Sequence, residues 1–277
     1  MTDAIALDAV GLTIQGRTIL HDISLTIRGG SLAALLGPSG CGKSTLLNLL
    51  AGFERPTTGT VHVDGELVTS PDPRRVLLFQ DGALLPWRTA EQNVAFGLEA
   101  RGLDQRAARE RARSYLAQVG LGTFADRLPG QLSGGQRQRV ALARALAAEP
   151  RVIFMDEPFS ALDTITRERL QDLVLKLAAQ HDTTVVLVTH DIDEALYLAD
   201  QCFVLAPDPG RLVDVVEVDA AQPRQRGSQV LSELKQRIVR HLIATWNEQS
   251  FEACNASEPS VQRSRLERLG RWVRMSG

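Results

Sequence analysis

The sequence predicts an α/β fold with a mostly parallel sheet, an antiparallel β region at the N-terminus and an inserted α-helical subdomain. Continuous apolar runs, which are typical of buried parallel strands, occur at residues 32–36, 152–155 and 184–188. Over 23–27 apolar and polar residues alternate instead, which favours a strand with one solvated face. Between about residues 81 and 150, helical spacing and an Ala-, Arg- and Gln-rich composition replace the strand pattern. Because strands resume afterwards, we interpret the helical stretch as an insertion.

The first part of the chain is expected to contain strands and one helix. Residues 5–36 read as short strands, and Arg28-Gly29-Gly30 turns the chain before the apolar run that enters Gly37. The further elements expected here are a helix over 44–50 that stops at Gly52, a strand over 61–63 before the turn Asp64-Gly65, and a buried strand over 76–79 before Gln80.

The second part is expected to begin with helices and then complete the sheet. Helical spacing covers 90–100, 105–119 and 135–148. Beyond Pro150 we expect buried strands over 152–155 and 184–188 with a helix over 167–180 between them, and strands over 202–206 and 212–218 that close the sheet. The predicted organisation is therefore one domain over 1–220, with the helical subdomain at about 81–150, followed by a C-terminal tail over 221–277 that has a helix-like stretch over 229–246 and an Arg-rich end.

Composition excludes several classes of protein. A net charge of −2 over 277 residues argues against a general nucleic-acid binder, which needs a large basic surface. Cys41, Cys202 and Cys254 are too widely spaced for a metal site, so a reducing cytosolic compartment is expected. The start of the chain lacks the pattern of a secretory signal, and no apolar run approaches the roughly 20 residues that span a bilayer. We therefore expect any membrane role to depend on a partner.

A phosphate-binding loop follows the first apolar run. It reads Gly37, Pro38, Ser39, Gly40, Cys41, Gly42, Lys43 and Ser44, and it fits G-x-x-x-x-G-K-[ST] between a strand and a helix. Glycines let backbone N–H groups surround phosphate oxygens, Lys43 reaches the β- and γ-phosphates, and Ser44 holds Mg²⁺. The alternative, a glycine turn followed by a chance Lys-Ser pair, does not explain the flanking strand and helix. Cys41 is expected to fill a small loop position.

Two carboxylates end the strand at 152–155. Asp156 would support Mg²⁺, directly or through water, and Glu157 would orient and polarise the attacking water. Alone, this pair reads as an acidic surface loop. Together with the phosphate loop it points to phosphoryl transfer, in which positioning and charge neutralisation do most of the catalysis.

His190 and Gln80 also follow predicted strands. Open α/β sheets bind ligands at the carboxyl ends of their strands, so His190 is placed to donate a hydrogen bond to a γ-phosphate. Gln80 is placed to touch Mg²⁺ or the attacking water and to report this to the helical insertion. Taken singly, a histidine is more often an ordinary surface or core residue, and a single glutamine is a weak signal.

A second phosphate site is predicted at the start of a helix. Ser133 caps the helix, while Gly134 and Gly135 leave backbone N–H groups uncovered beside the positive end of the helix dipole. Gln136 completes the segment Leu132-Ser133-Gly134-Gly135-Gln136, here called the signature. One nucleotide does not need two such sites in one chain, whereas two facing chains can share them.

Taken together, these motifs resemble the ATP-binding subunit of ABC transporters over about residues 5–220. The resemblance implies a P-loop NTPase (RecA-like) core, ATP and Mg²⁺ as ligands, and a head-to-tail homodimer that sandwiches ATP between one chain's phosphate loop and the other's signature. It assigns catalytic roles to Gln80, Glu157 and His190, and Mg²⁺ contacts to Ser44, Gln80 and Asp156. It assigns nucleotide contacts to residues 37–45, including Thr45, to Ser133–Gln136 and to Asp163 of the loop 160–163. One departure is Ile14, which stands where the family usually stacks an aromatic residue on adenine.

A finer resemblance is to importers of taurine, alkanesulfonates and nitrate. Its carriers are Phe79-Gln80, Leu84-Leu85-Pro86-Trp87-Arg88, Asn93-Val94-Ala95-Phe96-Gly97-Leu98 and Pro209-Gly210-Arg211. In that group the segment after Gln80 lies in the groove that receives the membrane permease, and Leu84, Leu85 and Trp87 suit such a groove or, equally, the interior of the helical subdomain.

The resemblance implies an ATPase that energises import of taurine, another sulfonate or nitrate. The partners it implies are integral membrane permease subunits and, indirectly, a solute-binding protein, at the cytoplasmic face of the inner membrane. Rival interpretations are the ATPase of an exporter, a soluble non-transport ABC ATPase and a small-molecule kinase, the last of which leaves the signature without a purpose. Near the C-terminus, five arginines with Leu266, Leu269 and Val273 read as a solvated end or as an amphipathic helix.

Overall fold

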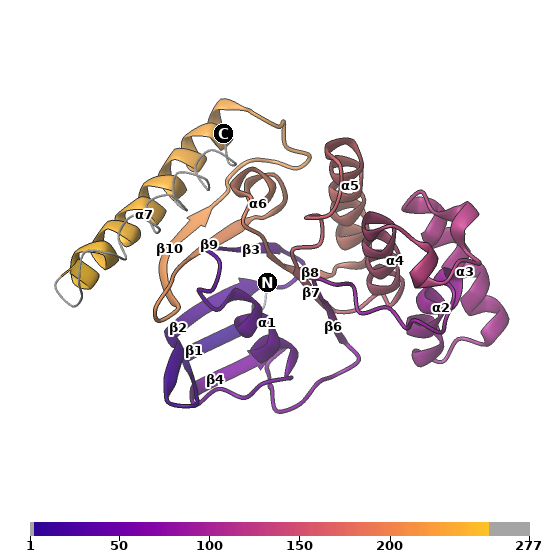
Figure 1. Cartoon of the computed structure of the whole chain (residues 1–277), viewed down its shortest axis with the longest axis horizontal. Helices are drawn as coiled ribbons and strands as arrows, with labels where there is room; N and C mark the ends of the chain where they lie inside the picture. Colours follow the sequence, from indigo (N-terminus) through magenta and orange to yellow (C-terminus); the bar gives the residue numbers. More distant parts are fainter. Residues whose placement is uncertain (1–2, 255–277) are drawn as a thin grey trace.

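The computed structural model describes residues 3–254, which form two sheets flanked by helices (Figure 1). The antiparallel sheet contains the first described residues, and the larger sheet lies between it and helices α5 and α6. The helical subdomain and helix α7 lie on opposite sides of the molecule in Figure 1. This arrangement agrees with the expected α/β architecture with an N-terminal antiparallel region and a helical insertion.

The antiparallel sheet has the strand order β2-β1-β4-β5. Its strands are β1 (Asp3–Ile14), β2 (Arg17–Arg28), β4 (Thr58–Val63) and β5 (Glu66–Leu67). In β2 the alternating Ile23, Leu25 and Ile27 are buried while their neighbours are exposed, as the sequence alternation predicts. This buried face packs on helix α1 (Lys43–Ala51) and on one face of the larger sheet, in one continuous apolar core.

The larger sheet has the order β10-β9-β3-β8-β7-β6. Its strands are β3 (Leu32–Leu36), β6 (Arg75–Leu78), β7 (Val152–Asp156), β8 (Thr184–Val188), β9 (Gln201–Ala206) and β10 (Arg211–Glu217), and all are parallel except β10. Consequently the carboxyl ends of β3, β6, β7 and β8 lie along the same edge of the sheet. The expectation that 76–79 is a buried strand is only partly correct, because β6 is the outer strand and three of its four residues are only half-buried.

The helical insertion contains three helices, each close to its predicted range. They are α2 (Ala90–Ala100), α3 (Gln105–Gln118) and α4 (Gly134–Ala147), with short 3-10 turns at Gly122–Phe124 and Pro129–Gln131. Thr89, Asp104 and Ser133 cap the three N-termini by accepting hydrogen bonds from first-turn N–H groups. Each cap fixes where its helix begins. Helix α4 therefore starts inside the signature.

Two helices cover the last strands of the sheet. Helix α5 (Thr164–His181) joins β7 to β8, and α6 (Ile192–Leu198) joins β8 to β9. Sequence periodicity predicts α5 but not α6. Helix α6 has seven residues, six of them buried, so it shows no alternation between an apolar and a polar face.

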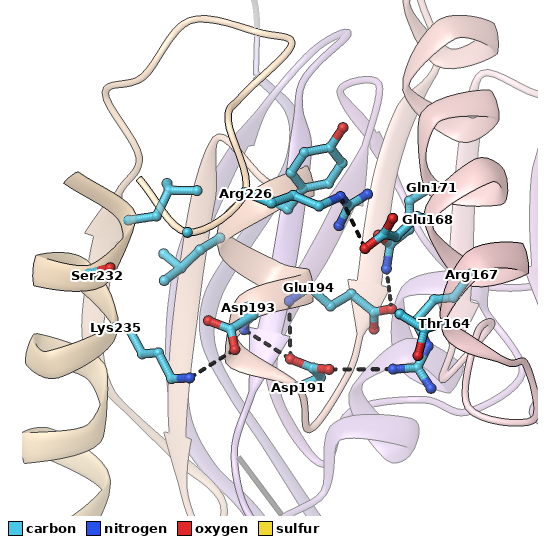
Figure 2. A pocket seen from close by; sticks show the side chains of 14 residues that line it. Thr164, Arg167, Glu168, Gln171, Asp191, Asp193, Glu194, Arg226, Ser232 and Lys235 are labelled. Atoms are coloured by element: carbon cyan, nitrogen blue, oxygen red, sulfur yellow. Dashed lines mark hydrogen bonds and ion pairs between the residues drawn. The ribbon is translucent and has the colours of Figure 1, made fainter. Parts of the chain in front are cut away.

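A pocket of about 470 Å³ separates α5, α6 and the start of α7 (Gln229–Cys254) (Figure 2). Lys235 of α7 lies 2.8 Å from Asp193 of α6, and Arg167 of α5 lies 3.8 Å from Asp191, which caps α6. Each of these two cations is paired with a carboxylate, so ion pairs across the pocket link α6 to α5 and to α7. The pocket lining extends from Asp191, the residue after His190, to α7.

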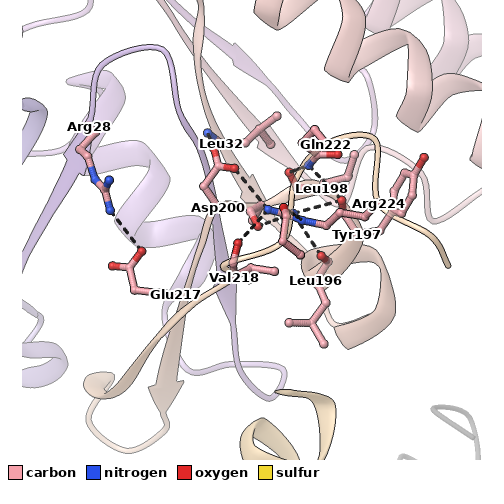
Figure 3. A network of polar contacts seen from close by, with 12 residues as sticks. Arg28, Leu32, Leu196, Tyr197, Leu198, Asp200, Glu217, Val218, Gln222 and Arg224 are labelled. Carbon is pink, nitrogen blue, oxygen red and sulfur yellow. Dashed lines mark hydrogen bonds and ion pairs between the residues drawn. The ribbon is translucent and has the colours of Figure 1, made fainter. Parts of the chain in front are cut away.

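Arg224 fastens the segment before α7 to the end of α6 (Figure 3). Its side chain is 2% exposed and lies 3.3 Å from Asp200. The guanidinium donates to backbone carbonyls at the end of α6 and in the segment after β10: those of Leu196, Tyr197, Ala199, Val218 and Ala220. The chain after the sheet is thereby held against the domain.

Helix α7 adds its own apolar contacts. Leu231, Ile238 and Leu242 are buried in a cluster with α6, β9 and β10, and each contributes on the order of 2 kcal/mol by leaving water. Within residues 3–254, none of the helices combines the length and apolarity that crossing a bilayer requires. The Arg-rich stretch expected near the C-terminus lies outside the described residues.

Candidate functional site

The phosphate loop connects the buried strand β3 to helix α1. Gly42 has a φ of 93° and caps α1 without a side-chain hydrogen bond, and a Cβ there would lie 2.6 Å from Leu20. Glycine is required at this position for both conformation and space. The first turn of α1, with Ser44 exposed and Thr45 half-buried, therefore has N–H groups available to an anion.

The side chains of the loop have distinct environments. Lys43 is 7% exposed, and its ammonium donates to the carbonyls of Gly37 and Pro38 at 2.8 and 2.9 Å. Cys41 is 1% exposed, and burial raises the pKa of its thiol, so it fills the loop interior as an inert residue. Ser39 and Gly40 are exposed at the outer side of the loop.

A pocket of about 430 Å³ lies beside the loop. Among its lining residues are Ser44, Gln80 and Asp156, the three expected Mg²⁺ contacts. Burial raises the pKa of Asp156, and a hydrogen bond from Ser44 partly offsets this. A hydroxyl, an amide and a carboxylate offer the oxygen donors that Mg²⁺ prefers, so this set fits the ion. The described residues contain no group of three or more His, Cys, Asp or Glu side chains arranged for a metal.

Three expected catalytic side chains meet at the same edge of the sheet. Gln80 Nε2 lies 3.3 Å from one carboxylate oxygen of Glu157, and His190 Nδ1 lies 3.1 Å from the other. They follow β6, β7 and β8, which are adjacent in the sheet, so the parallel topology brings them together. Glu157 itself has a φ of 46°, which is uncommon for a residue with a side chain.

The signature lies at the N-terminus of α4. Ser133 Oγ accepts from Gln136 N–H at 3.2 Å, and Gln136 Oε1 accepts from Ser133 N–H at 2.8 Å, which together form a capping box. A Cβ on Gly135 would lie 3.1 Å from the Ala161 carbonyl, so the close packing of α4 on this loop favours glycine there. Gly134 has no such neighbour. The signature contributes no residue to the lining of the pocket beside the phosphate loop.

The remaining two expected contacts lie apart from the pocket. Asp163 caps α5 by accepting from Thr166 N–H at 3.0 Å, and its hydrogen bonds lower the pKa of its carboxyl. Ile14 ends β1 and is 44% exposed, so an apolar surface is present at the position where an adenine ring is expected. Neither side chain lines the pocket that contains Ser44.

Sequence reasoning missed two positioning side chains. Gln138 of α4 is 6% exposed and bonds the Glu157 carbonyl and the Ala161 N–H group. Asn93 of α2 is fully buried and holds the segment before α2, because its amide bonds Leu85 and Arg88. Asn93 begins one of the segments shared with the importer group, and Gln138 comes two residues after the signature, but a sequence gives no sign of which loop a buried amide will reach.

Known proteins with similar sequences agree with the resemblance found in the sequence motifs. The family model described as ABC transporter matches residues 20–160. The taurine import ATP-binding protein TauB of Pseudomonas aeruginosa PAO1 is 50% identical over 218 residues, which cover 79% of this chain and 83% of that protein. The aliphatic sulfonates import ATP-binding protein SsuB 1 of Xanthomonas axonopodis pv. citri is 48% identical over 227 residues, covering 81% and 90%.

A solved structure matches the fold. The ATP-binding cassette MJ0796, solved as a dimer in a post-hydrolysis state bound to ADP and phosphate, is 34% identical with a TM-score of 0.71. The match covers 78% of this chain and 100% of that one. This confirms the predicted P-loop NTPase fold. The chain therefore belongs to the ABC transporter family, as an ATP-binding subunit that hydrolyses ATP.

Proposed function

We propose that this chain energises import of taurine or a related sulfonate through separate membrane permease subunits. The observation that carries the proposal is the meeting of Gln80, Glu157 and His190 beside the phosphate loop, in a chain 50% identical to a taurine import ATP-binding protein. We assign this activity to a domain over 1–220, with the helical subdomain at about 81–150 inserted in it.

The chemistry follows from the positions of these side chains. Lys43 and the N–H groups that begin α1 bind the phosphates of ATP, and the ammonium has to share its bonds to Gly37 and Pro38 with them. Glu157 orients the attacking water, and His190 and Gln80 hold its carboxylate from both sides. A magnesium ion held by Ser44 and Asp156, with Gln80 nearby, neutralises phosphate charge when bound.

The signature supports a homodimer in the ATP-bound state. Ser133 and the glycines after it form an anion-binding helix start that contributes nothing to the pocket beside the chain's own phosphate loop. A second chain, facing head-to-tail, supplies the phosphates for this helix start. The solved relative with the same fold is a dimer, which is consistent with this arrangement.

The segment 84–88 supports docking on a permease at the cytoplasmic face of the inner membrane. Leu84 is half-buried and packs into the core of the helical subdomain, whereas Trp87 is 72% exposed. Packing inside the helical subdomain therefore accounts for Leu84, and we propose docking for Trp87. Phe53 and Phe79 add exposed rings whose centroids are 6.0 Å apart beside Gln80. A solute-binding protein would act indirectly, through the permease.

The test is uptake by cells that lack this gene. A strain carrying the intact gene should grow on taurine or short alkanesulfonates as sole sulfur source and take up the labelled compound, whereas Lys43→Ala should do neither. Nitrate uptake serves as the comparison, and its loss in place of sulfonate uptake would contradict the proposed substrate. Normal uptake of every compound in the deletion strain would remove the import assignment and favour an exporter or a non-transport complex.

A further inference from the structure

A buried glutamine joins the signature helix to the loop that begins with Glu157. Gln138 of α4 donates from Nε2 to the Glu157 carbonyl at 2.9 Å, and its Oε1 accepts from the Ala161 N–H group at 3.1 Å. The two partners fix the orientation of the amide, because a carbonyl only accepts and an N–H group only donates. One side chain therefore holds both ends of the turn 157–161.

The residue that this amide holds is in a strained conformation. Glu157 has a φ of 46°, in the left-handed region that costs a side-chain-bearing residue on the order of 1 kcal/mol or more. Its N–H group donates to Val188 at 2.9 Å, and Ser160 Oγ also donates to its carbonyl at 3.0 Å. Such a backbone persists only where its surroundings determine it. Of the three residues that hold the backbone of Glu157, Val188 belongs to the neighbouring strand and Ser160 to the same turn, whereas Gln138 comes from helix α4.

The same helix approaches the turn at a second point. Gly135, one helical turn before Gln138, is so close that a Cβ there would lie 3.1 Å from Ala161 O and 3.3 Å from Leu162. Residues three apart share one face of a helix, so α4 contacts the turn along a line. Helix α4 thus contacts the backbone of Glu157 and Ala161 directly.

We propose that Gln138 is a positioning residue for ATP hydrolysis, which holds Glu157 in its active orientation and ties it to the signature helix. This rests on the proposed homodimer, in which α4 meets the nucleotide bound by the partner. The amide then links two sites: the start of α4 serves the partner's ATP, and Gln138 sets the carboxylate that serves the chain's own ATP. Contact between the start of α4 and the partner's ATP thus orients the Glu157 carboxylate toward the chain's own ATP.

The first test is the steady-state kinetics of the purified full-length chain. Gln138→Leu should lower kcat about 10- to 100-fold, since small displacements of a catalytic group have effects of that size, with KM for ATP changed less than about 2-fold. Gln138→Glu keeps the acceptor for Ala161 but places a carboxylate oxygen against the Glu157 carbonyl, and it should show at least a similar fall in kcat while circular dichroism shows a folded protein at the assay temperature. The matched control is Gln201→Leu. Gln201 is also a buried glutamine, bonded to Glu217 at the opposite ends of the parallel strands, so its kcat should stay within about 2-fold.

The second test is non-additivity. In the Glu157→Gln background, adding Gln138→Leu should leave the residual single-turnover rate unchanged, because the group that Gln138 positions is already lost. A further fall in that rate, or a normal kcat in either Gln138 variant, would overturn the proposal.

The proposed dimer has its own readout. Glu157→Gln should form a dimer with ATP in gel filtration or light scattering, and the double variant should do the same. If neither dimerises while Gln138→Leu still loses kcat alone, the positioning role stands and the link between two sites is refuted. If only the double variant fails to dimerise, Gln138 supports assembly and the positioning role is refuted.

Discussion

Among single residues, Asp156 shows how a side chain needed for function can lower the stability of the folded protein. Burial raises the pKa of this carboxyl beside the phosphate loop. A carboxyl with a raised pKa in the folded state contributes stability below its unfolded pKa of about 3.9 and loses that contribution as pH rises through the folded value. At neutral pH the ionised Asp156 therefore destabilises the nucleotide-free protein, which is the usual conflict between stability and function.

Asp156→Asn should accordingly stabilise the nucleotide-free chain at pH 7 while abolishing hydrolysis. The amide carries no charge to desolvate, so we expect Tm to rise by about 1–3 °C at pH 7, with the gain shrinking as pH falls toward 4 through the raised pKa of Asp156. Calorimetry at pH 7 and pH 4 without nucleotide measures this. Asp126→Asn, at a carboxylate 86% exposed, should leave Tm unchanged. A lower Tm for Asp156→Asn would show that its hydrogen bond with Ser44 outweighs the cost of burial.

At the scale of elements, helix α4 has two functions that one substitution can separate. Ser133→Arg removes the cap of α4 and places a bulky cation where the partner's phosphates are expected. Losing the cap costs about 1 kcal/mol, while the blocked contact should reduce hydrolysis at least about 100-fold and spare binding of labelled ATP to the single chain. Asp104→Ala, which removes the cap of α3 alone, should lower Tm and keep the rate. Equal losses of rate in both variants would make the signature a folding element only.

The elements also show what a sequence can and cannot predict. Apolar runs in the sequence predicted β3, β7 and β8, and the motif residues that follow these strands were therefore placed correctly at their carboxyl ends. Both predictions succeeded because strand periodicity and the need for glycine in a tight loop are local properties of the sequence. Helix α6 was missed because a short buried helix has no polar face, and β6 was placed too deep because its edge position depends on strand order. Gln138 was missed for a related reason: its two partners lie 19 and 23 residues away and meet it only in the tertiary fold.

At the scale of the whole molecule, Arg224 decides whether the chain after the sheet belongs to the domain. Arg224→Met should lower the free energy of unfolding by about 3–5 kcal/mol, because several buried carbonyls around α6 lose the donor that Arg224 supplies, and the 46% exposed Asp200 loses its cation. Urea unfolding followed by circular dichroism measures this. Arg240→Met, at an exposed position of α7, should stay within about 0.5 kcal/mol. A change of that size in Arg224→Met as well would mean that α7 docks through its apolar face alone.

The exposed ring of Trp87 connects the whole molecule to its proposed partner. Trp87 is 72% exposed next to a turn that the buried Asn93 holds rigid, so its position is fixed while its surface is free. Removing such a ring exposes no core, and Trp87→Ala should change Tm by less than about 2 °C. Aromatic anchors at an interface are commonly worth about 2 kcal/mol or more, so uptake of labelled taurine should fall at least about 10-fold.

Two measurements on the same cells and protein separate docking from catalysis in this variant. Co-purification with the permease should be lost in Trp87→Ala, while the control Val230→Ala, at a 50% exposed position of α7, should keep both co-purification and uptake. Full uptake in Trp87→Ala would exclude this segment as the contact that transmits closure of the ATPase to the membrane. Loss of uptake with co-purification intact would mean that Trp87 transmits movement without contributing affinity, and the aromatic pair Phe53 and Phe79 beside Gln80 would then be the next surface to change.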